Sequence, residues 1–273
     1  MRILFLGDVV GRAGRDAVTA ALPGLRAALR IDLCVVNGEN ASHGFGLAPD
    51  MAEALLRAGA DAITLGNHSW DRREIIPYMA QQKRVIRPLN YPPGTPGEGS
   101  VVVDLPGGRR ALVVNAMGRL FMDALDCPFR GTAELLARHR LGAGGTVQAA
   151  MCDFHAEATS EKQAYAHSFD GALSLVVGTH THVPTADHHV MAGGTAYQSD
   201  AGMCGDYDSV IGMGKEGAAT RFWKKVPGER LAPADGEATV CGLFVETDDQ
   251  TGLALRAEPV RQGGRLGSVM PVP

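Results

Sequence analysis

The sequence predicts an α/β protein with a largely parallel sheet, and it indicates that the sheet system as a whole is mixed. Within about 70 residues of the N-terminus, an apolar strand, a polar strand end and a helical stretch follow one another three times. This repeat is typical of βαβ units, whose strands run parallel. Further along, two valine-rich runs flank Pro106–Gly108, which indicates an antiparallel hairpin.

The strands of the first three units are predicted from continuous apolar runs, which suit strands buried on both faces. They are expected at Ile3–Leu6, Asp32–Val36 and Asp61–Leu65. After the first strand, an Ala- and Leu-rich helix should extend to about Arg30, and Pro23 should break or restart it. The next helix should begin at Pro49 and end near Gly59, because proline suits the first turn of a helix.

The rest of the chain continues the alternation of helices and strands. Helices are expected at Arg72–Gln82, at Arg130–Leu141 and at Thr159–Phe169, although Pro77 is awkwardly placed in the first of them. Strands are expected at 101–103, 111–114, 146–155, 173–177, 240–246 and 253–260, with a hairpin at 190–198. No linker or repeat is evident, so residues 1–273 are predicted to form a single domain, with about 261–273 as a loose tail.

Composition and charge argue against several classes of protein. Apolar residues make up 45% and charged residues 21% of the chain, as in globular proteins. The net charge of −4 argues against a general nucleic-acid surface. The first apolar run is too short for a signal peptide, and no stretch reaches the ~20 apolar residues that a membrane helix needs. The five cysteines form no Cys-x-x-Cys motif and read as reduced thiols, so we expect a cytoplasmic protein.

Polar residues that follow the predicted strands are candidate metal ligands. Asp8 follows the first strand, Glu39 and Asn40 follow the second, and Asn67 and His68 follow the third. The carboxyl ends of parallel strands lie at one edge of a sheet, so these side chains are expected to be neighbours. Taken singly, each could instead be a cap, a turn residue or an ordinary loop residue.

Two later strands contribute histidines. His155 ends the run at 146–155, and His180 and His182 follow the run at 173–177. Residues two apart in an extended chain point to the same side, so His180 and His182 are expected to face one side of the strand end. A pair of ordinary surface histidines is the alternative interpretation.

Together the candidates are two carboxylates, two amides and three imidazoles: Asp8, Glu39, Asn40, Asn67, His155, His180 and His182. One transition metal takes about four to six ligands, so this set suffices for two metals if one carboxylate bridges them. Two metals ~3.5–4 Å apart can clamp both oxygens of an in-line phosphoryl displacement and lower the pKa of a bound water. His68 is left over and could protonate a leaving alkoxide.

These blocks resemble those of calcineurin-like metallophosphoesterases. Gly66-Asn67-His68 is similar to their Gly-Asn-His block, and residues 178–182 are similar to their Gly-His-x-His block. The superfamily usually opens with Asp-x-His, whereas this chain has Asp8-Val9-Val10, and Glu39 stands where an aspartate usually bridges. These departures resemble the YmdB-type branch, whose signature is also similar to Asn37-Gly38-Glu39-Asn40 and Asp200-x-Gly202-Met203-x-Gly205. The resemblance extends from residue 1 to about residue 260.

The resemblance implies a four-layer α/β/β/α sandwich of two mixed sheets with a dinuclear iron or manganese site. It implies that one metal binds Asp8, Glu39, Asn40 and His182 and that the other binds Glu39, Asn67, His155 and His180. Glu39 would bridge, and Asn40 would replace the missing first-block histidine. The implied activity is hydrolysis of cyclic nucleotides, 2′,3′-cyclic ones and 3′,5′-cyclic ones, by attack of a metal-bound hydroxide with His68 as proton donor.

Two other interpretations remain. The chain could be a regulatory module that binds nucleotide, RNA or a protein through the metal site, with weak catalysis. It could also be a phosphomonoesterase with the same metals and a different pocket. For the enzyme, the expected partner is a small cyclic nucleotide or another phosphodiester, and the chain is expected to form a homo-oligomer.

Overall fold

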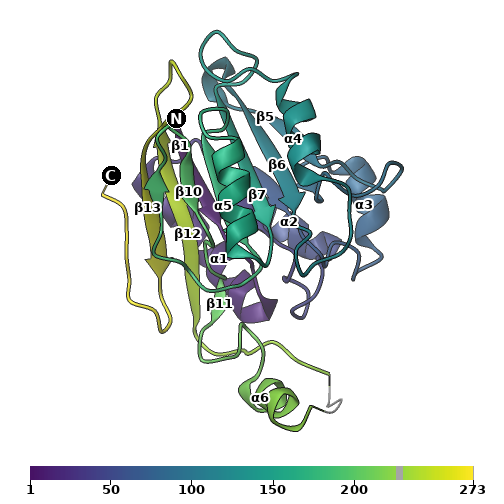
Figure 1. The fold of residues 1–273 in the computed structure, drawn as a ribbon. Helices are drawn as coiled ribbons and strands as arrows, with labels where there is room; N and C mark the ends of the chain where they lie inside the picture. Colours follow the sequence, from purple (N-terminus) through teal and green to yellow (C-terminus); the bar gives the residue numbers. More distant parts are fainter. Residues whose placement is uncertain (226–229, 273) are drawn as a thin grey trace.

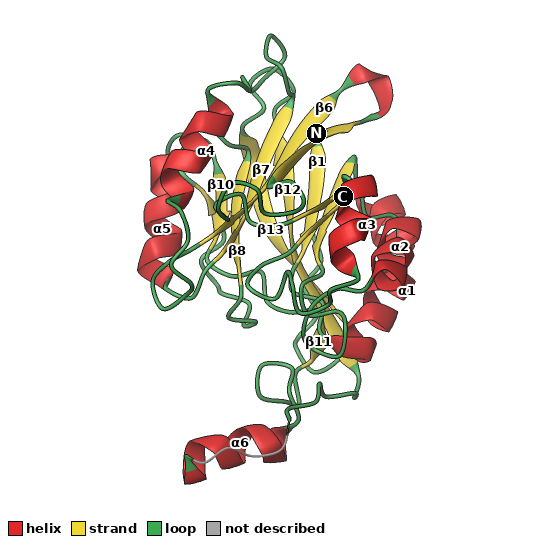
Figure 2. Ribbon diagram, turned by 90° about the vertical axis from the view of Figure 1, so that its right-hand side faces the viewer, coloured by secondary structure: helices red, strands yellow, loops and turns green. Residues whose placement is uncertain are grey.

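Two β-sheets lie face to face in the middle of the molecule, and helices cover the outer face of each sheet (Figure 1, Figure 2). The computed structural model describes residues 1–225 and 230–272. In this part of the chain, no helix has the length and apolar character that crossing a membrane would require.

The first sheet combines a parallel half with an antiparallel half. Its strands are β1 (Arg2–Leu6), β2 (Leu33–Asn37), β3 (Ala62–Thr64), β4 (Val85–Ile86), β11 (Gly205–Asp206), β12 (Ala238–Thr247) and β13 (Ala254–Gln262). Their order is β11-β12-β1-β2-β3-β4, with β13 also beside β12. The strands β1 to β4 are parallel, whereas β12 is antiparallel to β1, β11 and β13.

The second sheet has a parallel centre between antiparallel edges. Its strands are β5 (Ser100–Asp104), β6 (Arg110–Met117), β7 (Ala149–His155), β8 (Leu175–Thr179), β9 (His189–Val190) and β10 (Ala196–Gln198), in the order β5-β6-β7-β8-β10-β9. The strands β6, β7, β8 and β10 are parallel, and β5 and β9 pair antiparallel at the two edges. The short 3-10 helix η1 (Pro106–Gly108) lies between β5 and β6, as the hairpin prediction required.

Helices form the two outer layers. The helices α1 (Gly11–Leu29), α2 (Pro49–Ala58) and α3 (Ile75–Gln81) lie against the first sheet, and α4 (Pro128–Leu136) and α5 (Thr159–Ser168) lie against the second (Figure 2). The predicted four-layer α/β/β/α sandwich of two mixed sheets is confirmed. A sixth helix, α6 (Lys215–Lys224), projects away from the layers (Figure 1).

Alternating burial explains why the predicted strands read as continuous apolar runs. In β1, Leu4 and Leu6 belong to the apolar cluster beneath α1 and α2. Ile3 and Phe5 belong to a second cluster, which fills the space between the sheets. A third cluster lies between the second sheet and its helices α4 and α5. Neither face of β1 therefore meets water, and burying each such side chain contributes about 1.5–3 kcal/mol.

The helix α1 contradicts one sequence prediction, because Pro23 does not interrupt it. Proline removes one backbone hydrogen bond and crowds the preceding turn, which costs about 3 kcal/mol. The buried stripe that includes Val18, Leu22, Leu25 and Leu29 spans the proline and packs on the first sheet. Burial of four large apolar side chains outweighs the cost of a single proline.

Two further helix boundaries differ from the prediction. The helix predicted at 72–82 begins only at Ile75, which puts Pro77 in the first turn, where backbone N–H groups lack helical partners. The helix predicted at 130–141 ends at Leu136. The following chain turns instead, because the N–H groups of Thr146 and Val147 both donate to the carbonyl of Arg140.

The last strand reaches into the segment that was predicted as a tail. Arg261 and Gln262 are the final residues of β13. Arg261 and Val269 then exchange two backbone hydrogen bonds, of 2.7 and 3.0 Å. The last predicted tail residue, Pro273, lies outside the described residues.

Candidate metal centre

The predicted ligands lie where strands of the two sheets end beside one another. They follow or end β1, β2 and β3 in the first sheet and β7 and β8 in the second: Asp8, Glu39, Asn40, Asn67, His155, His180 and His182. Asp8 and His155 are fully buried, and Glu39 is 1% exposed. Residues from both sheets thus meet in the interior.

His155 lies in the middle of this group. Its Nε2 is 3.1 Å from Glu39 Oε1, 2.8 Å from Asn67 Oδ1 and 3.1 Å from His180 Nδ1. One ligand atom each from Glu39, His155 and His180 lies within 4.8 Å of the others. Because Nε2 carries at most one proton, it can donate to only one of these neighbours. A cation among these atoms would satisfy all of them.

Asp8 carries a buried oxygen without a hydrogen-bond partner. The backbone N–H of His180 donates to Asp8 Oδ2 at 3.3 Å, whereas Oδ1 has no partner. Oδ1 lies 3.8 Å from His182 Nε2 and 4.0 Å from His155 Nδ1. Two donor atoms that share one cation lie at most about 4.4 Å apart, since each metal–ligand bond is about 2.0–2.2 Å. The 3.8 Å separation of Asp8 and His182 fits such sharing.

Asn40 also carries a buried oxygen without a hydrogen-bond partner. Its Nδ2 donates to the carbonyl of Gly44 at 3.0 Å, which leaves Oδ1 as the free end, and this oxygen is buried without a partner. The Asn40 carbonyl accepts the N–H of Gly11 at 3.0 Å, so Asn40 lies beside the chain that follows Asp8. A buried polar atom without a partner costs about 1–3 kcal/mol. Two such buried oxygens fit oxygen ligands of a cation.

The hydrogen bonds of the histidines orient their free nitrogens. His182 Nδ1 lies 2.8 Å from the carbonyl of Ile211, which can only accept, so Nδ1 carries a proton and Nε2 faces Asp8. His155 Nδ1 lies 2.9 Å from Thr179 Oγ1. His180 Nε2 lies 3.1 Å from Glu157 Oε2, which leaves Nδ1 toward His155. Such outer partners fix the tautomer of metal-ligating histidines.

Asp153 anchors this arrangement, although no local sequence pattern points to it. Thr179 Oγ1 donates to Asp153 Oδ1 at 2.6 Å, so it must accept from His155 Nδ1. Thr64 Oγ1 and Asn37 Nδ2 donate to Asp153 Oδ2 at 2.5 and 2.9 Å. Burial raises the pKa of Asp153 to about 6, despite the opposing charge of His155. A fully bonded carboxylate thus holds the imidazole from behind.

The protein groups alone shift the pKa values at the centre in opposite directions. Burial would raise the pKa of Glu39, but the charge and hydrogen bond of His155 lower it to about 2. Burial would lower the pKa of His155, but Glu39 and Asp8 raise it to about 9. Burial and the charge of His155 lower the pKa of His180 to about 3. Burial raises the pKa of Asp8. At neutral pH, Glu39 is therefore ionised and His180 carries a free lone pair.

His68 borders the group without joining it. Its backbone N–H donates to Glu39 Oε2 at 3.3 Å, while its ring Nδ1 lies 2.9 Å from Asp71 Oδ2. The side chain is 27% exposed. Together with Asn67 and His180, His68 lines an open hollow of about 590 Å³. This position suits a group that exchanges protons with a molecule in the hollow, and Asp71 is a partner that the sequence did not single out.

Glycine is required at two of the strand ends. A Cβ at Gly66 would lie 2.2 Å from Glu39 Oε2 and 2.5 Å from His155 Nε2. A Cβ at Gly178 would lie 1.8 Å from the carbonyl of Ser199. Both strand ends approach their neighbours too closely for any side chain.

The turn after β8 corrects the geometry expected for its two histidines. His180 and His182 are not extended, because their φ angles are 95° and 67°. Asp200 holds the turn between them, since it accepts the Thr181 N–H at 3.0 Å and the Thr181 hydroxyl at 2.7 Å. The buried Lys162 Nζ pairs with the same carboxylate at 3.0 Å. His180 and His182 reach the centre through a strained turn, not through strand alternation.

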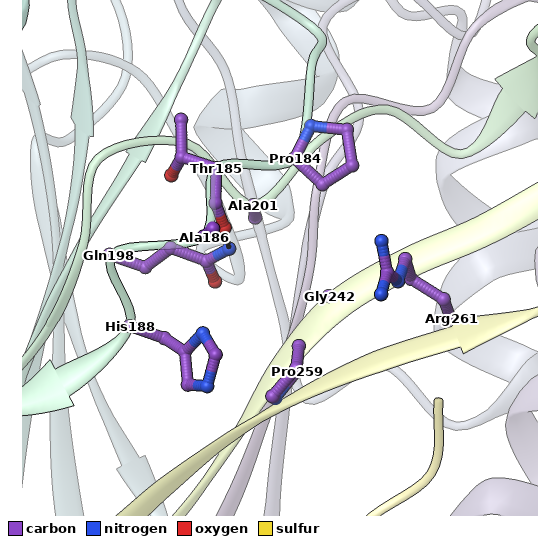
Figure 3. A pocket seen from close by; sticks show the side chains of 9 residues that line it. All are labelled: Pro184, Thr185, Ala186, His188, Gln198, Ala201, Gly242, Pro259 and Arg261. Carbon is purple, nitrogen blue, oxygen red and sulfur yellow. Dashed lines mark hydrogen bonds between the residues drawn. The ribbon is translucent and has the colours of Figure 1, made fainter. Parts of the chain in front are cut away.

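A second, smaller hollow lies beside β12 and β13 (Figure 3). It has a volume of about 110 Å³ and is lined by residues 184–186 and by His188, Gln198, Ala201, Gly242, Pro259 and Arg261. His188 Nδ1, Gln198 Oε1 and Arg261 Nε are buried without partners. The hollow has room for several water molecules, each of which needs about 10–15 Å³. No predicted ligand lines it, so water suffices to explain these three atoms.

The profile of one protein family, described as YmdB-like protein, matches residues 4–260. The chain is 44% identical over 260 residues to a protein of Bacillus subtilis named 2′,3′-cyclic-nucleotide 2′-phosphodiesterase, and the match covers 95% of this chain and 96% of that one.

Solved structures show the same fold. A hypothetical protein from Thermus thermophilus superposes with a TM-score of 0.89 at 42% identity, over 97% of this chain and 100% of that one. A protein from Mycoplasma pneumoniae, described as a novel phosphatase, superposes with a TM-score of 0.86 at 34% identity, over 96% of this chain and 93% of that one.

Proposed function

The chain belongs to the YmdB-like protein family, and we propose that it is a metal-dependent phosphodiesterase acting on 2′,3′-cyclic nucleotides. The observation that carries the proposal is the cluster of ligand atoms from the buried Glu39 and His155 and the partly buried His180, with the unpartnered Asp8 Oδ1 beside it. Oxygen and imidazole ligands without thiolate suit iron or manganese. The relative in Bacillus subtilis carries the name of a 2′,3′-cyclic-nucleotide 2′-phosphodiesterase, which supports this substrate class.

Seven side chains would hold two ions. One ion would take Asp8, Glu39, Asn40 and His182, and the other would take Glu39, Asn67, His155 and His180. The bridging role of Glu39 is supported by its two oxygens, since Oε1 lies 3.1 Å from His155 Nε2 while Oε2 accepts the His68 N–H. The Asn40 role is supported by its buried, unpartnered Oδ1.

The chemistry divides between the ions and His68. Two ions so held would withdraw charge from the phosphoryl oxygens and make a water molecule acidic enough to act as nucleophile at neutral pH. In our proposal the His68 imidazolium gives its proton to the leaving 2′-oxygen as the P–O2′ bond breaks, which leaves a 3′-phosphomonoester. Asp71 Oδ2, 2.9 Å from His68 Nδ1, would fix the orientation of the ring.

The test is turnover of 2′,3′-cyclic AMP by chelator-treated protein to which Mn²⁺ is returned. We expect activity that disappears with the chelator and returns with the metal. The same panel includes 3′,5′-cyclic AMP, which we propose as a further substrate, and a phosphomonoester. Absence of turnover with bound metal would refute the enzyme and favour a regulatory binding module. A faster reaction with the monoester would favour a phosphomonoesterase.

We further propose a cytoplasmic location, which the five free cysteines support. A homo-oligomer stays a prediction from the sequence.

A further inference from the structure

One aromatic side chain faces solvent on the rim of the hollow beside the metal centre. The lining of the hollow combines Asn67, His68, Asp71 and His180 with the loop residues Phe121, Met122 and Asp123. Phe121 is 83% exposed. A phenylalanine that exposed contributes little to the stability of the fold, because its ring stays in water.

The backbone of Phe121 is also unusual. Its φ is +61°, in the left-handed region that side chains other than those of glycine, asparagine and aspartate seldom adopt. Conformations of this kind persist where surrounding contacts enforce them, and they gather at ligand sites. Burial of the ring does not offset this backbone strain, because the ring is exposed.

Hydrogen bonds of the three residues before Phe121 tie the loop to the metal centre. The N–H of Gly118 donates to the carbonyl of His155 at 3.0 Å. The N–H groups of Arg119 and Leu120 donate to the carboxylate of Glu161 at 3.0–3.1 Å. Phe121 follows only three residues after Gly118, so its Cα lies at most about 11 Å from that anchor. The ring is therefore held at a limited distance from a proposed ligand.

We propose that Phe121 is the platform on which the nucleobase of the substrate stacks, so that the hollow is a nucleobase subsite. This inference rests on the proposed phosphodiesterase function. The phosphate would lie at the Asn67, His68 and His180 side of the hollow, and the base would lie on the ring. A nucleotide joins an anionic group to a flat aromatic ring a few bonds away, and the hollow offers a partner for each.

Stacking explains why an aromatic residue is exposed at this position. Each base has a π-face, so stacking on an aromatic ring tolerates all bases and favours the larger purines. The side chain of Leu120, 46% exposed on the same loop, does not line the hollow and offers no flat face. It provides a matched control for removal of apolar surface from this loop.

The experiment compares two substrates in Phe121→Ala, Phe121→Trp and Leu120→Ala. The first is 2′,3′-cyclic AMP, and the second is methyl ribofuranoside 2,3-cyclic phosphate, which has the same reacting group and no base. In Phe121→Ala we expect KM for 2′,3′-cyclic AMP to rise by about 5- to 150-fold with little change in kcat. KM for the substrate without a base should stay as in the wild type. Phe121→Trp and Leu120→Ala should keep both values near those of the wild type.

The outcomes separate this subsite from the function on which it rests. An unchanged KM for 2′,3′-cyclic AMP in Phe121→Ala, or an equal rise for both substrates, would overturn the subsite and leave the phosphodiesterase intact. A wild type that hydrolyses neither substrate would overturn the phosphodiesterase and the subsite together. A larger effect with 2′,3′-cyclic AMP than with 2′,3′-cyclic CMP would further support stacking.

Discussion

Two buried aspartates that contact the His180–His182 turn have opposite surroundings. Asp200 is 1% exposed, and its carboxylate accepts from Lys162 Nζ, from both the N–H and the hydroxyl of Thr181, and from the N–H of Gly202. Asp8 is fully buried, yet its Oδ1 has no partner and its Oδ2 accepts only the long bond from His180.

Their hydrogen bonds separate a structural carboxylate from a metal ligand. A buried charge is tolerated when it is paired and hydrogen-bonded, as Asp200 is. Asp8 and Glu39 instead face imidazoles that are themselves held from behind through Thr179 and Ile211. Burial alone does not distinguish the two regions, whereas unsatisfied oxygens do.

Removal of His68 should separate proton transfer from metal binding. His68→Ala is expected to lower kcat on 2′,3′-cyclic AMP by about 10²–10⁴-fold, the usual contribution of general acid catalysis. Its metal content should equal that of the wild type, because the ring contacts Asp71 and none of the proposed ligands. Steady-state kinetics and metal analysis of the same preparation provide the two readouts. Undiminished turnover would remove His68 from the mechanism.

Removal of Lys162 should cost stability. Lys162→Met leaves Asp200 as a buried charge without its counter-ion, which is expected to lower the free energy of unfolding by about 3–5 kcal/mol. Urea unfolding followed by circular dichroism measures this loss. The control is Lys215→Met, which breaks an exposed ion pair with Asp208 and should leave stability nearly unchanged. If Lys162→Met unfolds at the wild-type urea concentration, Asp200 is not held as we describe.

Loss of the Thr179 hydroxyl should weaken the metal centre without removing a ligand. Thr179→Val deletes the link between His155 and Asp153, and outer partners of this kind are worth about 10- to 100-fold in metal affinity. Calorimetric titration of chelator-treated protein with Mn²⁺ measures the change. Thr132→Val is the matched control, because it removes a buried hydroxyl on α4 that is bonded to Tyr165 on α5. Equal affinities in the two variants would refute the anchoring role.

Most of the candidate ligands were predictable because they are local signals at strand ends. Asp8, Glu39 and Asn67 each follow a short apolar run, and parallel strands bring such ends to one edge. The residues behind them were not predictable. Asp153 lies inside β7, and Lys162 lies on α5, where it reads as an ordinary exposed helix residue. Their roles depend on pairings between elements that no local pattern encodes.

The fold likewise combines features that local sequence patterns predict with features that they do not. Apolar runs predicted the strands, since burial on both faces leaves no polar alternation to confuse the signal. Pro23 misled the helix prediction, because local preference does not register the buried stripe that crosses it. The left-handed φ angles of His180 and His182 were likewise invisible, as they are enforced by Asp200 from another segment.

The metal content of three proteins tests the central distinction most directly. Wild type, Glu39→Gln and Asp200→Asn are stripped with a chelator, reloaded with Mn²⁺, desalted and analysed for bound metal. We predict two ions per chain in the wild type and in Asp200→Asn, and fewer than two, without phosphodiesterase activity, in Glu39→Gln. Two ions per chain in Glu39→Gln, or none in the wild type, would contradict the account.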